Sequence, residues 1–144
     1  MPDSVSLRPI TRETVRAVCE LRLADGQERL VAPAAFTVAE GHYEPGALLR
    51  AIHLGDRPVG VLLVEVESGT PYLVRFMVDA EHQRHGVGRR AVELLVEELR
   101  AGGWRTLETS YAPVAGGSGA FWRGCGFEDT GRVTGDEPIV ARPL

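Results

Sequence analysis

Apolar positions recur along the chain with two different periods, and they predict one domain that mixes α-helices with β-strands. Between residues 88 and 101, Ala91, Leu94, Leu95 and Leu99 fall at helical spacing, and two glycines end the predicted helix. Shorter apolar runs rich in β-branched residues are typical of strands. The expected strands are residues 4–9, 51–54, 59–66, 72–78, 106–110 and 128–133, followed by a last extended segment around residues 139–140.

The first third of the chain carries a weaker pattern than the rest. Thr11 is expected to cap a helix that runs to about residue 23. Residues 24–46 are expected to be irregular, because prolines and glycines interrupt them, and a long connection in a compact domain is often functional. A short helix is expected at residues 118–124. Together these elements predict a single α/β domain over residues 1–144 with a mixed sheet.

Composition narrows the classes of partner. The chain has 144 residues and a formal net charge of −4, which argues against nucleic acid and favours a cationic small molecule. No window approaches the about 18 apolar residues of a membrane span, and the first residues do not resemble a signal peptide. We therefore expect a cytoplasmic protein without a membrane partner. Cys19 and Cys125 lack the spacing of zinc ligands, so no metal is expected.

The most informative segment is the loop at residues 83–88, Gln-Arg-His-Gly-Val-Gly, which lies between a predicted strand and a predicted helix. Its two glycines let the backbone approach a ligand closely, and the N–H groups at a helix start favour an anion. The spacing matches neither a P-loop nor the GxGxxG of a dinucleotide-binding fold. From composition alone, this loop is either a pyrophosphate site or a plain strand-to-helix turn.

Three residues of this loop carry a resemblance to a known family. Gln83, Gly86 and Gly88 fill the motif Gln/Arg-x-x-Gly-x-Gly/Ala, so the segment resembles the signature of the GNAT (Gcn5-related N-acetyltransferase) superfamily. Residues 121–127, Phe-Trp-Arg-Gly-Cys-Gly-Phe, resemble the Phe/Leu-Tyr-x-x-x-Gly-Phe segment of the same superfamily. Upstream pieces, among them residues 75–79, resemble the bacterial spermine/spermidine (diamine) acetyltransferase branch. The resemblance covers nearly the whole chain.

This resemblance implies a fold and a co-substrate. The fold is GNAT-like, with a mixed, mostly antiparallel sheet of about six to seven strands, about four flanking helices and a splayed central strand pair. The co-substrate is acetyl-CoA, with its pantetheine arm on the backbone of the strand before the loop and its pyrophosphate on the loop. The cofactor-binding residues implied in this way are Phe76, Met77, Val78, Gln83, Arg84, His85, Gly86, Val87, Gly88, Arg89, Ser118, Phe121 and Trp122.

The implied reaction, N-acetylation of a primary amine, requires a group that accepts a proton. A free alkylamine is protonated at neutral pH, so a carboxylate acting directly or through water would serve. Glu40 fills an acidic position of the polyamine-branch pattern and is the first candidate for both catalysis and substrate binding. Glu28, Glu44 and His53 are further candidates for substrate binding.

Trp122 stands where many GNAT enzymes carry a tyrosine that protonates the leaving thiolate. An indole N–H can donate a hydrogen bond, but it does not release its proton at physiological pH. Either the thiolate leaves without such help, or Tyr111, Ser118 or Cys125 substitutes as the acid. A third reading is acyl-CoA binding with little catalysis. In each case Trp122 is expected to pack against neighbouring aromatic residues.

Several acceptors stay open at this point. A small cationic amine such as a polyamine suits the acidic residues of segment 24–46, although Ala34 replaces a polar residue of the polyamine pattern. The alternatives are an antibiotic amine, an amino-acid amine and a protein N-terminus. A non-catalytic acyl-CoA sensor and a nucleotide-binding module are rivals from other classes. Homodimers are common in the superfamily, so a homodimer is expected by analogy.

Overall fold

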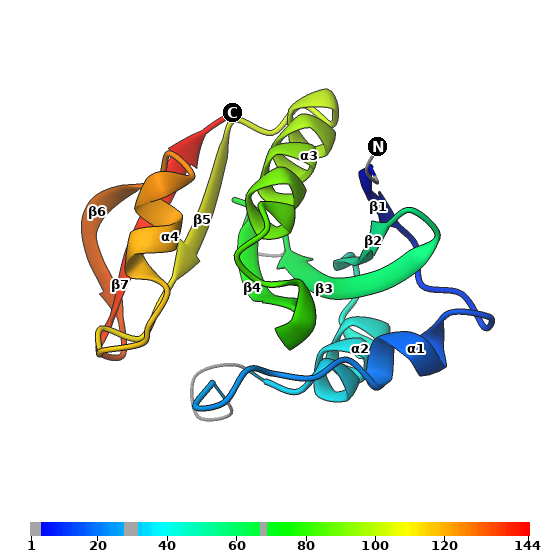
Figure 1. The fold of residues 1–144 in the computed structure, drawn as a ribbon. Coiled ribbons are helices and arrows are strands. Elements are labelled where there is room, and N and C mark those ends of the chain that lie inside the picture. Colours follow the sequence, from blue (N-terminus) through cyan, green and yellow to red (C-terminus); the bar gives the residue numbers. More distant parts are fainter. Residues whose placement is uncertain (1–3, 28–31, 67–68) are drawn as a thin grey trace.

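The computed structural model describes residues 4–27, 32–66 and 69–144, and within them it shows seven strands and four α-helices (Figure 1). The strands are β1 (Val5–Arg8), β2 (Leu48–Leu54), β3 (Arg57–Glu65), β4 (Tyr72–Val78), β5 (Thr106–Ser110), β6 (Glu128–Thr134) and β7 (Glu137–Pro143). The helices are α1 (Val15–Cys19), α2 (Ala34–Tyr43), α3 (Val87–Ala101) and α4 (Gly119–Gly124), with a 3-10 turn, η1 (Ala80–His82).

The strands form one sheet in the order β1-β2-β3-β4-β5-β7-β6. Neighbouring strands are antiparallel throughout, except that β4 and β5 run parallel. The predicted mixed, mostly antiparallel sheet with about four helices is therefore confirmed.

The parallel pair at the centre of the sheet separates soon after it begins. Only Tyr72 and Glu108 are in register between β4 and β5, and next to them the Thr109 hydroxyl donates to the Leu73 carbonyl (2.8 Å). On the other side of β4, Leu63 pairs with Arg75 and Val64 pairs with Leu73, so Val74 is an extra residue. Such a bulge bends its strand, and this explains why β4 turns away from β5 (Figure 1).

Two apolar layers cover the two faces of the sheet. On one face, the buried stripe of α3 packs with α4 residues against the strands, and it includes Ala91, Leu95 and Leu99. On the other face, Val18 of α1 and Ala34 of α2 pack with β-strand residues. The helix predicted at residues 88–101 is thus confirmed, because its apolar stripe has one face to bury.

The first predicted helix is wrong in its extent. Helix α1 covers only Val15–Cys19, with Thr14 rather than Thr11 at its N-cap position. The Thr11 carbonyl instead accepts hydrogen bonds from the Thr14 and Val15 N–H groups, so the preceding residues form a turn. Residues 20–27, which follow this helix, are not helical.

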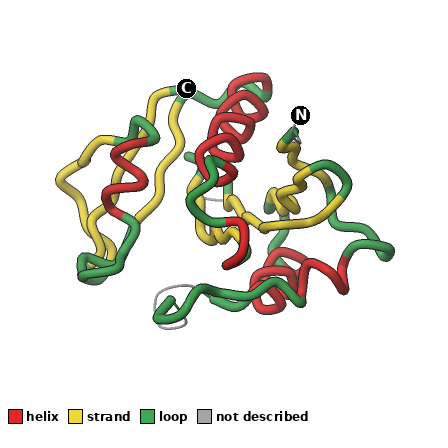
Figure 2. Tube along the Cα trace, viewed as in Figure 1, coloured by secondary structure: helices red, strands yellow, loops and turns green. Residues whose placement is uncertain are grey.

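The expectation of an irregular segment at residues 24–46 is also wrong in part, because α2 lies within it (Figure 2). Phe36 and Tyr43 are exposed on this helix, so its apolar residues do not form one stripe that a pattern could reveal. A glycine normally destabilises a helix when it lies in the interior of that helix, as Gly41 does. Here a Cβ at Gly41 would lie 3.0 Å from methyl groups of Leu49 and Leu63, so close packing against the sheet explains the glycine.

An ion pair joins the C-terminal strands to the central helix. The Arg142 guanidinium donates to both carboxylate oxygens of Glu93 on α3 (2.5 and 3.1 Å) and to the Cys125 carbonyl (2.9 Å). The hydrogen bond from Arg142 lowers the pKa of Glu93, while partial burial opposes this effect. The bidentate geometry fixes β7 and the end of α4 against α3.

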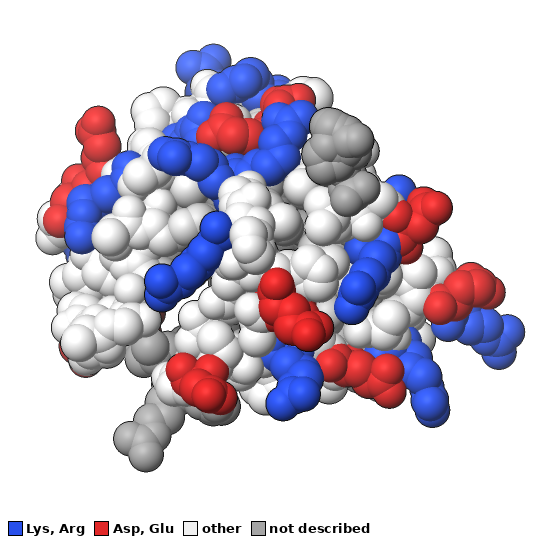
Figure 3. Space-filling view, in the orientation of Figure 1, with Lys and Arg blue, Asp and Glu red and all other residues white. Residues whose placement is uncertain are grey.

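Charged side chains of both signs are interspersed on the face of the molecule in Figure 3. Along the described residues, no helix has both the length and the apolar character that crossing a bilayer requires.

Candidate active site

The loop at residues 83–88 is built to expose backbone N–H groups at the start of α3. Gly86 occupies the N-cap position with φ of +82°, a left-handed conformation that favours glycine, and no side chain caps the helix there. Arg84 also has a positive φ, +66°, which is uncommon for a residue with a side chain. The first N–H groups of this 15-residue helix therefore remain open to an anion.

Gln83 anchors this loop to the end of β4. Its side-chain amide donates to the Val78 carbonyl (2.9 Å) and to Gln27 Oε1 (3.0 Å). Asp79, which is 8% exposed, supports the same turn by accepting hydrogen bonds from the Arg22 N–H (2.8 Å) and the Glu81 N–H (3.3 Å). Burial alone raises the pKa of Asp79, but these hydrogen bonds and His82 outweigh it and leave the pKa lowered.

The side chains of the loop point in different directions. Arg84 and His85 are exposed, whereas Val87 is buried in the core and contributes only its backbone. Arg89 turns to α4, where its guanidinium donates to the Gly124 carbonyl. A Cβ at Gly88 would lie 3.4 Å from the Phe121 ring, so the loop packs closely on α4.

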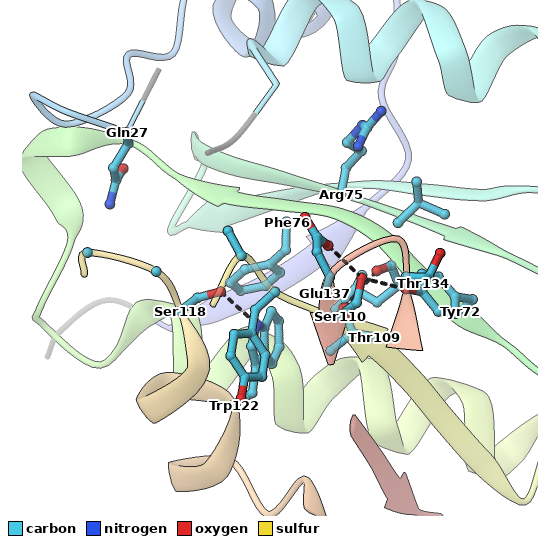
Figure 4. A pocket seen from close by; sticks show the side chains of 16 residues that line it. Gln27, Tyr72, Arg75, Phe76, Thr109, Ser110, Ser118, Trp122, Thr134 and Glu137 are labelled. Atoms are coloured by element: carbon cyan, nitrogen blue, oxygen red, sulfur yellow. Dashed lines mark hydrogen bonds between the residues drawn. The ribbon is translucent and has the colours of Figure 1, made fainter. Parts of the chain in front are cut away.

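A cavity of about 360 Å³ opens where β4 and β5 separate (Figure 4). This volume lies within the range of small-molecule sites. The walls come from residues 72–76 of β4, residues 109–112 at the end of β5, residues 116–118 before α4, and the β6–β7 hairpin. Gln27, which contacts Gln83, lines the same cavity and so connects it to the loop.

The open edge of β4 is formed by alternate residues. The Asp79 N–H donates to the Val59 carbonyl (2.7 Å), and a Cβ at Gly60 would lie 2.5 Å from the Met77 carbonyl oxygen. The Met77 backbone therefore faces β3, and alternation turns the backbone of Phe76 and Val78 towards β5. Of the three backbones expected at the open edge, the structure places Phe76 and Val78 there and Met77 in the β3–β4 ladder.

An aromatic cluster forms the wall of the cavity on the α4 side. Trp122 is 4% exposed and makes edge contacts with Phe76, Phe121 and Phe127 at centroid distances of 4.9–5.4 Å. Its indole N–H donates to Ser118 Oγ (2.9 Å), so this donor already has a partner. The predicted packing of Trp122 against aromatic neighbours is confirmed.

Two of the proposed substitutes for a general acid take different places. Tyr111 lines the cavity, and its hydroxyl accepts a hydrogen bond from Arg123 (3.3 Å). A Cβ at Gly119 would lie 2.7 Å from the Tyr111 ring, so this glycine lets the ring pack on α4. Cys125 lies in the core, where burial raises the pKa of its thiol, and it is not part of the cavity wall.

Glu40 does not line the cavity, but it forms an ion pair with a residue that does. Arg75 Nε on β4 donates to Glu40 Oε1 on α2 (3.1 Å), and each side chain is 33% exposed. The Arg75 guanidinium also lies over the Phe36 ring, 5.6 Å from its centroid. Arg75 itself lines the cavity, so the pair links α2 to the site.

The remaining substrate-binding candidates do not gather at this cavity. Glu44 follows the last residue of α2 and does not line the cavity. His53 is 2% exposed within β2, between β1 and β3, so its side chain belongs to the packed sheet. Glu28 lies outside the described residues.

Three residues that the sequence interpretation missed also line the cavity, namely Tyr72, Ser110 and Glu137. They are joined by hydrogen bonds across β4, β5 and β7. No local motif predicts that they come together, because they meet only through the pairing of strands that are distant in the sequence. Among the described residues, no group of three or more His, Cys, Asp or Glu side chains could hold a metal ion.

Comparisons with known proteins identify the class of protein. A profile of the acetyltransferase (GNAT) family matches residues 15–127, so the chain belongs to the GNAT acetyltransferase family. A comparison of the sequence with curated proteins gives no match.

Solved structures share the fold over nearly the whole chain. An acetyltransferase from Thermus thermophilus has 22% identity and a TM-score of 0.79, covering 98% of this chain and 97% of its own. The PaiA N-acetyltransferase from Thermoplasma acidophilum, solved with coenzyme A, has 10% identity and a TM-score of 0.72, covering 98% and 99%. The ribosomal-protein-S18-alanine N-acetyltransferase from Escherichia coli has 22% identity and a TM-score of 0.72, covering 98% and 94%.

Proposed function

We propose that this protein transfers the acetyl group of acetyl-CoA to a primary amine. The observation that carries the proposal is the start of α3, an uncapped helix end with Gly86 in a left-handed conformation. The contact of Gln83 with Gln27 connects it to the cavity between β4 and β5. An anion-binding helix start beside a cavity for the reacting groups suits a substrate with a pyrophosphate and a reactive thioester.

The residues present fit coenzyme A. The N–H groups that begin α3, together with the exposed Arg84 and His85, would hold the pyrophosphate. The backbone of Phe76 and the Val78 N–H at the open edge of β4 would hold the pantetheine arm, since Gln83 already occupies the Val78 carbonyl. Acetyl-CoA supplies an activated acyl group, and donors at this edge would stabilise negative charge that develops on its carbonyl oxygen.

The leaving thiolate has limited help from the residues of the cavity wall. The N–H of Trp122 donates to Ser118, and neither group is an acid that releases a proton at neutral pH. Tyr111 is the tyrosine closest to Trp122 in the sequence, and it also lines the cavity. We infer that the thiolate departs with help from water or Tyr111, because acid assistance contributes about 10²–10⁴-fold and is not absolute.

The first acceptor class to test is a small cationic amine, with polyamines among its members. Antibiotic amines, amino-acid amines and protein N-termini are the alternatives. One of the proteins with the same fold is the ribosomal-protein-S18-alanine N-acetyltransferase from Escherichia coli. The similar fold does not distinguish among them. A homodimer in the cytoplasm, binding neither nucleic acid nor membranes, completes the proposal.

A thiol-release assay with a panel of amines tests the reaction against its main rival, a non-catalytic acyl-CoA sensor. The chain has 16 arginines and no lysine, so the protein offers no lysine ε-amine of its own to acetyl-CoA. An enzyme releases thiol with at least one amine of the panel. Tight coenzyme A binding without thiol release from any amine would support the sensor instead.

The loop assignment is tested by placing a carboxylate at the start of α3. Gly86→Glu and Gly88→Glu should each abolish coenzyme A binding in calorimetry, because they bring bulk and negative charge to the proposed pyrophosphate site. The control is Gly103→Glu, which adds the same charge beyond the other end of α3, at a glycine with φ of +90° and nothing within 4 Å of its added Cβ. Affinity that survives both loop substitutions would refute the assignment.

A further inference from the structure

Three polar side chains outside the proposed cofactor contacts form a directed hydrogen-bond chain at one end of the cavity. The Tyr72 hydroxyl donates to Ser110 Oγ (2.6 Å), and the Ser110 hydroxyl donates to Glu137 Oε1 (2.9 Å) (Figure 4). Each hydroxyl thus directs its proton towards Glu137. A carboxylate is a strong hydrogen-bond acceptor, so this arrangement holds the Glu137 side chain in place.

The pKa of Tyr72 is consistent with its role as the first hydrogen-bond donor of this chain. Burial raises the pKa of its phenol, and the negative charges of Glu137 and Glu108 raise it further, while the hydrogen bond with Ser110 opposes the increase. Tyr72 therefore stays protonated at neutral pH and remains a donor. The hydrogen-bond chain ends on the Glu137 carboxylate. It therefore gives this carboxylate a hydrogen-bond donor but no positive charge.

Glu137 differs in this respect from the other carboxylates nearby. Arg75 neutralises Glu40 (3.1 Å), and Arg132 neutralises Glu108 (2.5 Å). Across residues 4–27, 32–66 and 69–144, no ion pair includes Glu137. Figure 4 shows the Arg75 side chain extending away from the Ser110–Glu137 contact and towards the helix above it. A half-buried carboxylate in a cavity is stabilised by a cation that enters it.

We propose that Glu137, held in place by Ser110 and Tyr72, binds the ammonium group of the acceptor. The inference rests on the proposed function and deepens it, because it assigns the preference for a charged acceptor to one residue. An ammonium group has three donors and no acceptor, so it complements the lone pairs of Glu137 that Ser110 leaves open. Ser110 and Tyr72 are positioning residues that act through this carboxylate.

The test compares Glu137→Gln with Asp136→Asn, using phenethylamine and aniline as acceptors. Asp136 is exposed in the turn of the same hairpin and does not line the cavity, so it controls for the loss of one negative charge. Phenethylamine is protonated at pH 7, whereas aniline is uncharged. Glu137→Gln should raise KM for phenethylamine about tenfold to a hundredfold, and leave KM for aniline and acetyl-CoA within about twofold.

Asp136→Asn should behave like the unsubstituted protein with both acceptors. Equal KM values for phenethylamine in Glu137→Gln and Asp136→Asn would overturn the inference. If Glu137→Gln does not fold, the inference is tested with Ser110→Ala and Tyr72→Phe. Each should raise KM for phenethylamine about two- to tenfold, because the Glu137 side chain loses hydrogen bonds that hold it in place. An unchanged KM in both would also overturn it.

A binding experiment separates this inference from the proposed function. If the protein binds coenzyme A but releases no thiol with any amine, the proposed reaction fails and the ammonium site is still measurable. Phenethylammonium chloride is then titrated into the coenzyme A complex by calorimetry. Binding at least about tenfold weaker in Glu137→Gln than in Asp136→Asn supports the site, and equal binding in the two variants overturns it.

Discussion

At the scale of single residues, His53 is an unusual member of the core. Its side chain is 2% exposed, and neither ring nitrogen has a hydrogen-bond partner among the described residues. Burial lowers the pKa of the imidazole, and the positive charge of Arg8 lowers it further, while Asp56 opposes both effects. A histidine held in its neutral form inside a sheet makes the stability of the fold sensitive to acid.

We therefore predict that the free energy of unfolding falls as the pH is lowered through about 6.5, the ordinary histidine pKa. Because the folded-state pKa of His53 is lowered, the unfolded chain binds the proton more tightly, and acid favours unfolding. The loss should reach at most about 1.4 kcal/mol per pH unit, until the folded-state pKa is passed. Urea unfolding of the protein and of His53→Leu between pH 5 and about 8 measures it.

The His53→Leu variant should show a shallower dependence on pH over this range, because it has no imidazole to protonate. His42→Gln is the matched control, since His42 is exposed on α2. If His53→Leu and His42→Gln retained the same pH dependence as the unsubstituted protein, the acid sensitivity would arise elsewhere.

At the scale of elements, β4 carries two opposite constraints. It must stay close to β3 along most of its length, and it must leave β5 after one registered pair. The bulge at Val74 provides the bend, and Gly60 provides the close approach on the β3 side. The cavity therefore depends on how tightly β3 and β4 pack.

Gly60→Ala should disturb this packing. The added Cβ would lie 2.5 Å from the Met77 carbonyl oxygen and 2.9 Å from Ile52 Cδ1, so the two strands must move apart. We expect a loss of about 1–3 kcal/mol in the free energy of unfolding, measured by urea titration. Gly102→Ala is the control, because its Cβ meets no atom closer than 3.4 Å. Equal stability of the two variants would contradict the close approach.

At the scale of the whole molecule, the candidate site lies where the two halves of the sheet meet. The N-terminal half supplies β4 and Gln27, and the C-terminal half supplies β5, the segment before α4 and the β6–β7 hairpin (Figure 1). The pair of Arg142 with Glu93 fixes the second half to α3, whose start is the proposed anion site. A ligand that spans the loop and the cavity would contact both halves.

Coenzyme A should consequently stabilise the whole fold. At a concentration of about 100 times Kd, the expected gain is about 2.7 kcal/mol, which corresponds to a rise in Tm of about 5–10 °C for a domain of this size. Differential scanning calorimetry with and without coenzyme A measures it. Gly86→Glu should show no rise, whereas Gly103→Glu should match the unsubstituted protein. The same increase in Tm for Gly86→Glu would place the binding site elsewhere.

A residue of the site could be predicted from the sequence only where residues close to it in the sequence indicate its role. Gly86 could be read directly, because its left-handed conformation before the start of α3 favours glycine for local reasons. Gly88 matched the same motif, but it lies within α3 and packs on Phe121. Glu40 was found by its position in a pattern, but its ion pair with Arg75 was not. Glu137 carries no local signal at all, since its neighbours in space are Ser110 and Tyr72 from other strands.

By itself, the sequence determined the family resemblance, the loop proposed to bind an anion and most strands and helices after residue 48, because each depends on neighbours within one segment. It did not determine α2, in which Gly41 packs closely against the sheet. Only the tertiary structure decided where β4 leaves β5 and which carboxylate enters the resulting cavity. Those features depend on strand pairing between distant segments, and no local pattern of residues records that pairing.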